Sequence, residues 1–375
     1  MTDAVRHLYV HVPFCARRCS YCDFSIAVRP DVPVSEFLAA LRAELAVRRA
    51  AGMAPPHLDT LYLGGGTPSH LGPDGVRALL DLVREFASWP VDAEVTLEAN
   101  PDDVSPAATR DWHDAGITRV SLGAQSFDAG VLAWMHRTHS VEQVHRAVDV
   151  IRDTPFDSWS FDLIFALPAT LERDWERDLA LALGKAPPHL SLYGLTVEQG
   201  TPLGRWADRG EVLPADETTY EREFLRAHHL AASAGLQHYE VSNFGRPGHE
   251  SRHNGSYWSG AAYLGLGPSA HGYDGDSRRW NISAYAAWRD AAVRGVDPVG
   301  GTELLGRVER RLEAVYLGLR TIGGLHVDTS EQALVAPWVS AGWATLDDDI
   351  LRLTPLGWLR LDALAAALTP VPALQ

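Results

Sequence analysis

The stretch VPFCARRCSYCDF, residues 12–24, contains Cys15, Cys19 and Cys22, and the chain of 375 residues has no other cysteine. The spacing C-x3-C-x2-C directly follows an apolar run at residues 7–13. We therefore expect the thiols to lie in a loop after the first strand. Three cysteines cannot all pair with one another, so the stretch predicts a metal site or a redox site rather than a set of disulfides.

Four interpretations of this cluster compete. A structural zinc site needs four ligands, for which His11 is available, but the x3 spacing is unusual for zinc. A redox pair of Cys19 and Cys22 lacks a thioredoxin-like context, and a third interpretation is that the thiols are inert and lie together by chance. The fourth interpretation, which we favour, is an iron–sulfur cluster. Such clusters usually have four cysteine ligands, so three thiolates leave one iron open to an external ligand.

The first two-thirds of the chain alternate strand-like and helical stretches. The strand-like runs cover residues 7–13, 60–66, 94–101, 119–126, 159–168 and 190–201. Several are almost continuously apolar, as strands covered on both faces are. Six β-α units in a row predict an α/β fold with a parallel sheet, which is a barrel, a partial barrel or a doubly wound sheet.

Polar or glycine-rich residues lie at the carboxyl ends of these runs, where parallel sheets place their binding sites. They are Cys15, Gly64–Pro68, Glu98, Asn100, Gln125, Ser126, Asp162 and Glu198. Their repeated position predicts one shared site.

The pattern changes after residue 235. Residues 236–300 are rich in glycine, aromatic residues and histidine, and we expect an irregular connecting region. Residues 301–375 predict an amphipathic helix from about residue 302, then a hairpin with the acidic residues 347–349 at its turn, then a helix. This pattern predicts a small, mainly helical, winged-helix-like domain.

Composition narrows the class of protein. The net charge of −15 argues against a nucleic-acid partner, because phosphate binding needs a basic face. No stretch is long and apolar enough for a transmembrane segment, and the first residues lack the features of a signal peptide. We therefore expect a cytoplasmic protein.

The cysteine spacing after the first strand of a β/α barrel resembles the radical S-adenosylmethionine (SAM) superfamily, and the resemblance covers nearly the whole chain. YVHVPFCARRCSYCDF, GGGTP, LEANP, GAQSF and DLIFALP follow one another as in its coproporphyrinogen dehydrogenase-like branch. The resemblance implies a partial (β/α)6 barrel, a [4Fe-4S] cluster on the three cysteines, and bound S-adenosylmethionine.

Within that branch the chain resembles the haem chaperones of the HemW type more than the oxygen-independent coproporphyrinogen III oxidases. The oxidases carry a fourth cysteine where this chain has Phe24, and they have a long N-terminal arm, whereas here the first strand starts near His7. HemW-type proteins carry H-N-x-x-Y-W, which is present as residues 253–258.

The resemblance also implies roles for single residues. It places eight around S-adenosylmethionine: Tyr9, Gly65, Gly66, Thr67, Glu98, Gln125, Arg137 and Asp162. From the residues alone, the glycines also fit a tight turn, and the polar side chains also fit structural roles. His253 is the expected haem ligand, with His271 as a second candidate. The alternative is a turn at Asn254 with Tyr257 and Trp258 plugging the barrel.

The expected function is to bind haem and transfer it to an acceptor protein, with an electron donor as a further partner. The alternative is an oxygen-independent coproporphyrinogen III oxidase, against which Phe24 argues. A third hypothesis is a radical enzyme with another substrate. The sequence leaves open whether the protein is an enzyme and which protein accepts the haem.

Overall fold

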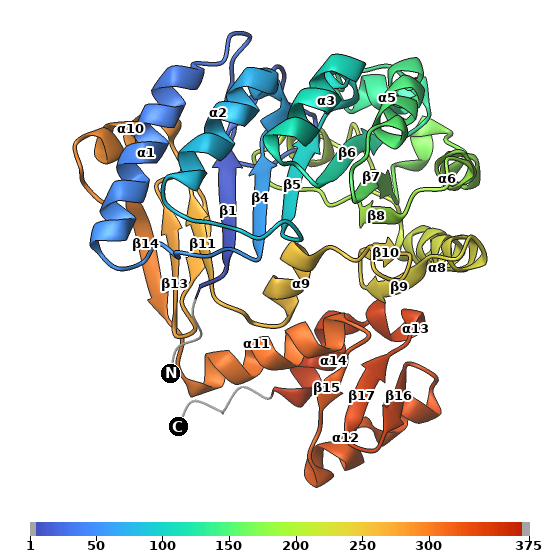
Figure 1. Ribbon diagram of the computed structural model, residues 1–375. Helices are drawn as coiled ribbons and strands as arrows, with labels where there is room; N and C mark the ends of the chain where they lie inside the picture. Colours follow the sequence, from blue (N-terminus) through green and yellow to red (C-terminus); the bar gives the residue numbers. More distant parts are fainter. Residues whose placement is uncertain (1–4, 370–375) are drawn as a thin grey trace.

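The computed structural model describes residues 5–369 and is dominated by one twelve-stranded sheet (Figure 1). Its strand order is β14-β13-β12-β11-β1-β4-β5-β6-β7-β8-β10-β9. Six strands lie in chain order, each parallel to the next: β1 (His7–Val12), β4 (Thr60–Gly65), β5 (Glu94–Ala99), β6 (Arg119–Gln125), β7 (Ser158–Phe165) and β8 (His189–Gly194). This order confirms the predicted partial (β/α)6 barrel, because a doubly wound sheet would reverse its strand order at a switch point.

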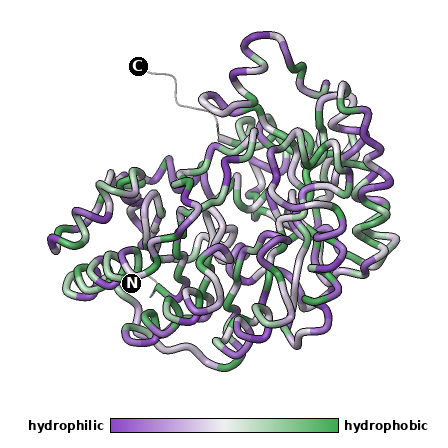
Figure 2. The backbone as a smooth tube through the Cα atoms, turned by 90° about the horizontal axis from the view of Figure 1, so that it is seen from above, coloured by the Kyte–Doolittle hydropathy of each residue, from purple (hydrophilic) through white to green (hydrophobic). Residues whose placement is uncertain are grey.

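Helices on the outside of the sheet connect these strands (Figure 1). In α2 the residues Val76, Leu79, Leu80 and Val83 recur at helical spacing and are all buried. Figure 2 shows hydrophobic and hydrophilic residues alternating along the outer helices, as expected where one face covers a sheet. The longer helices of this layer are α1 (Val34–Ala50), α2 (Gly72–Arg84), α3 (Pro106–Ala115), α5 (Val141–Asp153), α6 (Trp175–Gly184) and α8 (Glu217–Ser233). The short helices α4 (Ala129–Trp134) and α7 (Pro202–Asp208) lie beside the cysteine loop, where the backbone of Ser20 bonds to Met135 and Leu203.

Short polar residues fix where several helices begin. Ser140 and Gln143 form a reciprocal capping box at the start of α5. Asp174 and Asp216 accept backbone N–H groups at the starts of α6 and α8. Short elements complete this part of the chain: β2 (Phe14–Cys15), β3 (Ala27–Val28), η1 (Pro68–Leu71), η2 (Pro101–Asp103) and η3 (Ala169–Leu171).

The structure of residues 236–300 differs from the irregular connection that we expected. Strand β11 (Tyr263–Leu266) extends the sheet parallel to β1, and β12 (His271–Tyr273), β13 (Ser277–Asn281) and β14 (Val299–Leu304) follow antiparallel. The strands β9 (Gln237–Glu240) and β10 (Asn243–Gly245) extend the other edge beside β8. These strands are short and lack apolar alternation, so the existing sheet edges specify them more than their own pattern does. The helices here are α9 (Arg252–Trp258) and α10 (Tyr285–Val293).

The C-terminal part combines a three-stranded sheet, in the order β15-β17-β16, with helices. The predicted hairpin is present and turns at Asp348 and Asp349. The first helix begins at Arg307 instead of near residue 302, because residues 299–304 pair with β13 as strand β14. The elements are α11 (Arg307–Arg320), β15 (Leu325–His326), α12 (Thr329–Ser340), β16 (Ala344–Asp347), β17 (Ile350–Leu353), α13 (Pro355–Trp358) and α14 (Leu361–Leu368).

The C-terminal part lies below the sheet in Figure 1 and packs against β9. Arg320 forms an ion pair with the fully buried side chain of Glu240 (3.0 Å), and the rings of His238 and Trp358 meet at 4.4 Å. These contacts hold it against the barrel. The division of the chain at residues 235 and 300 into three units stays a prediction. Within residues 5–369, no helix combines the length and apolarity needed to cross a membrane.

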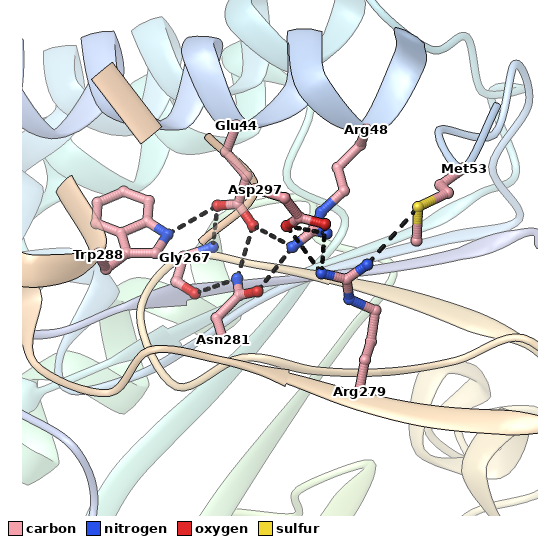
Figure 3. A network of polar contacts seen from close by, with 8 residues as sticks. All are labelled: Glu44, Arg48, Met53, Gly267, Arg279, Asn281, Trp288 and Asp297. Carbon is pink, nitrogen blue, oxygen red and sulfur yellow. Dashed lines mark hydrogen bonds and ion pairs between the residues drawn. The ribbon is translucent and has the colours of Figure 1, made fainter. Parts of the chain in front are cut away.

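A buried polar network ties α1 to the strands that extend the sheet beyond β1 (Figure 3). The carboxylate of Glu44 accepts hydrogen bonds from the Gly267 backbone N–H (2.9 Å), Asn281 Nδ2 (2.6 Å) and Trp288 Nε1 (2.9 Å). It also pairs with Arg48 at 3.1 Å, and both side chains are fully buried. Buried donors need acceptors, and here donors from three separate segments share the Glu44 carboxylate. This single carboxylate therefore joins α1, α10 and the β11–β13 extension.

We predict that Glu44→Gln lowers the free energy of unfolding by about 1–3 kcal/mol, since it removes one of the two carboxylates that pair with the buried Arg48, leaving only Asp297, and turns an amide N–H toward other donors. Urea unfolding followed by circular dichroism measures this change. Glu36→Gln on the same helix is the matched control, because the ion pair of Glu36 with Arg289 is largely exposed and should matter little. Equal stability of the two variants would contradict the assignment.

Candidate functional site

A cavity of about 450 Å³ lies at the carboxyl ends of the parallel strands. Each of the six strands contributes lining residues at or just beyond its end, as the sequence predicted for a shared site. The lining includes Cys15, Cys19, Cys22, Gly65, Gly66, Thr67, Glu98, Asn100, Ser121, Gln125, Arg137, Asp162 and Tyr193. The structure therefore brings together all three cysteines and seven of the eight residues expected around S-adenosylmethionine, leaving only Tyr9 outside the lining.

The three thiols lie on one wall of this cavity, and two of them receive hydrogen bonds. Thr67 Oγ1 donates to Cys15 Sγ (3.5 Å), and Arg137 donates to Cys19 Sγ (3.2 Å). Burial raises the pKa of Cys22 to about 11 and also raises the pKa of Cys15. Hydrogen-bond donors to sulfur favour the thiolate form, whereas burial disfavours it. A bound metal would stabilise the thiolates enough to offset their burial.

The geometry does not favour the zinc alternative. Both ring nitrogens of His11 are engaged, one with the Ser25 carbonyl (2.9 Å) and the other with the Tyr9 hydroxyl (3.1 Å). Among residues 5–369, no three side chains of His, Cys, Asp or Glu converge as they would on a single ion. His11 is therefore not positioned to complete a four-ligand zinc site with the cysteines.

Gly65, the last residue of β4, and Gly66 have a packing role that the sequence did not reveal. A Cβ on Gly65 would lie 2.6 Å from the His11 ring, and a Cβ on Gly66 would lie 2.8 Å from the Phe14 carbonyl oxygen. Gly65 also has φ of +113°, which disfavours other residues. The N–H of Gly65 donates to Glu98, and that of Gly66 to the Val12 carbonyl. The glycines thus let β4 end close against β1, which brings Thr67 to Cys15.

Two carboxylates with raised pKa values face the cavity. Burial raises the pKa of Glu98 to about 7, and the negative charge of Asp162 adds to the rise. Burial likewise raises the pKa of Asp162 to about 6, although Ser121 donates to it (3.0 Å). Two carboxyl groups that resist ionisation until a positive charge arrives are suited to a cationic ligand.

Arg137 and Gln125 lie on the wall near Cys19. Arg137 donates to Cys19 Sγ and the Gly123 carbonyl, yet its Nε is buried and has no hydrogen-bond partner among the described residues. Gln125 has φ of +67° at a register shift between β6 and β7. A buried unpaired donor and a strained non-glycine residue beside one cavity are both features of ligand sites.

Tyr9 lies in the barrel interior beneath the cavity. Its hydroxyl bonds to His11 Nδ1, and its ring stacks on Tyr62 with centroids 6.1 Å apart. Tyr62 in turn donates to Glu98 (2.8 Å). Tyr9 thus supports residues of the cavity and is not among those that line it. Its direct contact with a ligand stays a prediction.

The structure places His253, the expected haem ligand, in an enclosed position, and its role as a ligand stays a prediction. Its side chain is fully buried at the amino ends of the strands, where Nδ1 bonds to Thr60 Oγ1 (2.7 Å) and Nε2 to the Tyr257 hydroxyl (2.7 Å). Burial lowers its pKa to about 3. Both ring nitrogens are occupied, so neither is free for iron in this arrangement. The motif forms helix α9, and its histidine closes the lower end of the barrel.

His271, the second candidate, is exposed on β12, where its ring stacks on Trp280 with centroids 6.0 Å apart. Its role stays a prediction. The structure also adds Ser121 and Tyr193 to the cavity, which sequence reasoning did not single out. Ser121 is a lone hydroxyl in an apolar strand, a signal that could have been followed. Tyr193 gave no such signal, since aromatic residues are common in strands.

Comparisons with known proteins agree with this architecture. Residues 9–182 match the family model described as "Radical SAM superfamily". The heme chaperone HemW of Mycobacterium tuberculosis (strain ATCC 25618 / H37Rv) is 38% identical over 367 residues, covering 96% of this chain and 94% of that protein. The heme chaperone HemW of Bacillus subtilis (strain 168) is 33% identical, covering 86% of this chain and 85% of that protein.

Among solved structures, coproporphyrinogen III oxidase (HemN) of Escherichia coli superposes with a TM-score of 0.80. The match covers 98% of this chain and 91% of that protein, at 21% sequence identity. At this identity the likeness establishes a shared fold over nearly the full length.

We predict that Glu98→Gln raises the melting temperature of the ligand-free protein by a few degrees at pH 8 and has less effect at pH 5. The folded pKa of about 7 exceeds that of an exposed glutamate, so wild-type stability falls as pH rises from about 4.5 through 7. Glutamine avoids the buried charge and still reaches Gly65 N–H and the Tyr62 hydroxyl. Thermal unfolding at both pH values measures this.

The control for this experiment is Glu85→Gln, whose exposed carboxylate pairs with Arg42 and has a lowered pKa. Its small effect should have the opposite sign. A Glu98→Gln variant that is less stable than wild type at pH 8 would show that the carboxylate is not strained there.

Proposed function

The chain belongs to the radical SAM superfamily and, within it, to the HemW family, and from this premise we propose that it binds haem and transfers it to an acceptor protein. We further propose that it carries a [4Fe-4S] cluster and S-adenosylmethionine. The observation that carries the proposal is the 38% identity with the M. tuberculosis heme chaperone across 96% of this chain.

The runner-up, oxygen-independent coproporphyrinogen III oxidation, rests on fold likeness to HemN at 21% identity. One feature of this chain weighs against it. Phe24 takes the position of the fourth cysteine expected in the oxidases, and its side chain is 57% exposed at the rim of the cavity.

The residues of the cavity fit the proposed cluster. Cys15, Cys19 and Cys22 would hold it, with Thr67 and Arg137 donating hydrogen bonds to sulfur. When bound, such a cluster supplies one-electron reduction and an open iron for an external ligand. Hydrogen bonds to the ligating sulfurs stabilise negative charge and so tune the reduction potential. An electron donor is accordingly a proposed partner.

The same cavity fits S-adenosylmethionine, which carries a positive sulfonium, an amino group and a carboxylate. Glu98 and Asp162 would favour the cationic groups, because a nearby positive charge lowers the pKa of both carboxyls. Arg137, with its unpaired Nε, would receive the carboxylate. Gln125 offers an amide for hydrogen bonding, and Gly65, Gly66 and Thr67 shape the edge beside the cluster.

We predict that anaerobically reconstituted protein holds about four irons and sulfides per chain, and that Cys19→Ala abolishes this. A metal site with three protein ligands does not tolerate the loss of one. Iron and sulfide analysis with the absorption spectrum measures the result. Asp23→Ala, an exposed residue of the same loop, is the control and should keep the cluster. Stoichiometric zinc without sulfide would refute the cluster.

The function is tested by adding haem to the cluster-containing protein and then mixing the complex with a haem-free acceptor protein. We predict binding of about one haem per chain and its transfer to the acceptor, followed by absorption spectroscopy. We also predict no conversion of coproporphyrinogen III with S-adenosylmethionine and reductant present. Robust conversion would favour the oxidase, and an absence of haem binding would remove the chaperone hypothesis.

A further inference from the structure

A second cavity, of about 490 Å³, lies between the end of α9, the strands β11–β13 and helix α11. The residues that define it are Tyr257, Trp258, Tyr263, Tyr273, Arg278 and Arg310. We call it the lower cleft. Its volume is typical of sites for small molecules and cofactors.

The lower cleft lies at the opposite end of the sheet from the cavity of about 450 Å³ beside the three cysteines, which we call the cofactor cavity. Tyr263 pairs with His7 at the start of β1, and His7 also pairs with Thr60 at the start of β4. The cofactor cavity lies instead where these strands end, at Cys15 and Gly65. In Figure 1, α9 and α11 are both below the parallel strands. A ligand in the lower cleft would therefore not compete with one beside the cysteines.

The walls of the lower cleft suit a flat, apolar ligand. Tyr257 and Tyr263 meet edge to face with centroids 4.6 Å apart, and Trp258 extends this aromatic surface. Other lining residues are small and leave room for a planar molecule: Gly260, Ala261, Ala314 and Gly318. Aromatic faces pack well against extended π systems.

The rim of the lower cleft carries two cations. Arg278 pairs with Glu313 at 3.1 Å, and Arg310 pairs with Asp276. Both pairs are partly exposed to solvent, so they contribute little energy and can exchange for other carboxylates at small cost. Two arginines at the edge of an aromatic slot match a flat ligand that carries two carboxylates.

Two polar atoms at the lower cleft lack partners. Trp258 Nε1 and Arg278 Nε are buried and form no hydrogen bond with the described residues. The Tyr263 hydroxyl also forms none with residues 5–369, although a tyrosine oxygen can ligate haem iron. Unsatisfied donors in a folded protein call for an explanation, and a ligand in the cleft supplies one.

We propose that the lower cleft is the haem site of this protein, with Tyr257 and Trp258 packing on the macrocycle. In this site Arg278 and Arg310 bind the two propionates, and Tyr263 Oη ligates the iron. The inference rests on the proposed haem-binding function and adds its location. It also replaces His253 with Tyr263 as the ligand, since His253 lies beneath Tyr257 and is fully hydrogen-bonded.

The test titrates haem into full-length protein with its cluster, using calorimetry for affinity and difference absorption spectra for iron ligation. Ala314→Phe fills the cleft from an exposed position and should weaken haem binding at least about tenfold, or about 1.4 kcal/mol. Arg278→Gln with Arg310→Gln should weaken it by about as much. Tyr263→Phe should change the ferric haem spectrum, and metal-free protoporphyrin should bind wild type and Tyr263→Phe alike.

Two controls match these changes outside the lower cleft. Val308→Phe adds the same ring to an exposed position of α11, and Arg294→Gln removes an exposed arginine near α10. Both should bind haem as wild type does. Saturating S-adenosylmethionine should leave haem affinity unchanged, because its proposed site is at the other end of the barrel.

The outcomes separate the inference from the function. If wild type binds haem and the cleft variants bind it equally, the lower cleft is not the site, while the chaperone proposal stands. Displacement of haem by S-adenosylmethionine would move haem to the cofactor cavity and overturn the inference. If ATP competes with haem as strongly as protoporphyrin does, the lower cleft is a nucleotide site and the inference is wrong. If wild type binds no haem, the proposed function fails and the inference fails with it.

Discussion

Strand β1 is paired along its length with β4 on one side and for most of its length with β11 on the other, and this double pairing is the constraint on which the rest of the structure depends. It fixes the register of the strand, because a shift of one residue would turn every side chain to the opposite face. The carboxyl end of β1 then delivers Cys15 beside Thr67. Its amino end sets His7 beside Thr60 and His253. Strand β1 thus positions Cys15 in the cofactor cavity at its carboxyl end, and it positions His253, which closes the barrel, at its amino end.

The buried network around Glu44 supports this arrangement from the outer side of the barrel, where α1 packs on the sheet. It holds α1 against Gly267, whose backbone passes so close to His11 that a Cβ would lie 2.4 Å from the His11 carbonyl oxygen. His11 in turn packs against Gly65 and orients Tyr9. The position of α1 is therefore linked to the wall of the cofactor cavity by a series of direct contacts, in which Gly267 packs on His11 and His11 packs on Gly65.

In the cofactor cavity, burial disfavours the charged forms of several ionisable groups, and a ligand of opposite charge would stabilise them. Two carboxyls and two thiols have raised pKa values because the cavity removes them from water. Metal ions convert thiols to thiolates, and a cationic ligand stabilises ionised carboxylates. At neutral pH the two buried carboxyls thus reduce stability without ligands and would also contribute to binding, a trade-off common at functional sites.

The sequence by itself determined the parallel β/α core and most of the residues that meet at the cavity beyond its strand ends. Apolar runs of strand length and polar residues at their ends have local signatures, and parallel strands necessarily bring their carboxyl ends together. Cys15, Glu98 and Asp162 could therefore be assigned to one cavity from their positions alone. Only the tertiary structure decided the strands of residues 237–304, which depend on free sheet edges. It also decided that Tyr9 lies beneath the cavity and that His253 is enclosed, with both ring nitrogens bonded. A side chain's direction and partners depend on residues distant in the chain, such as Thr60 for His253, and no local pattern encodes them.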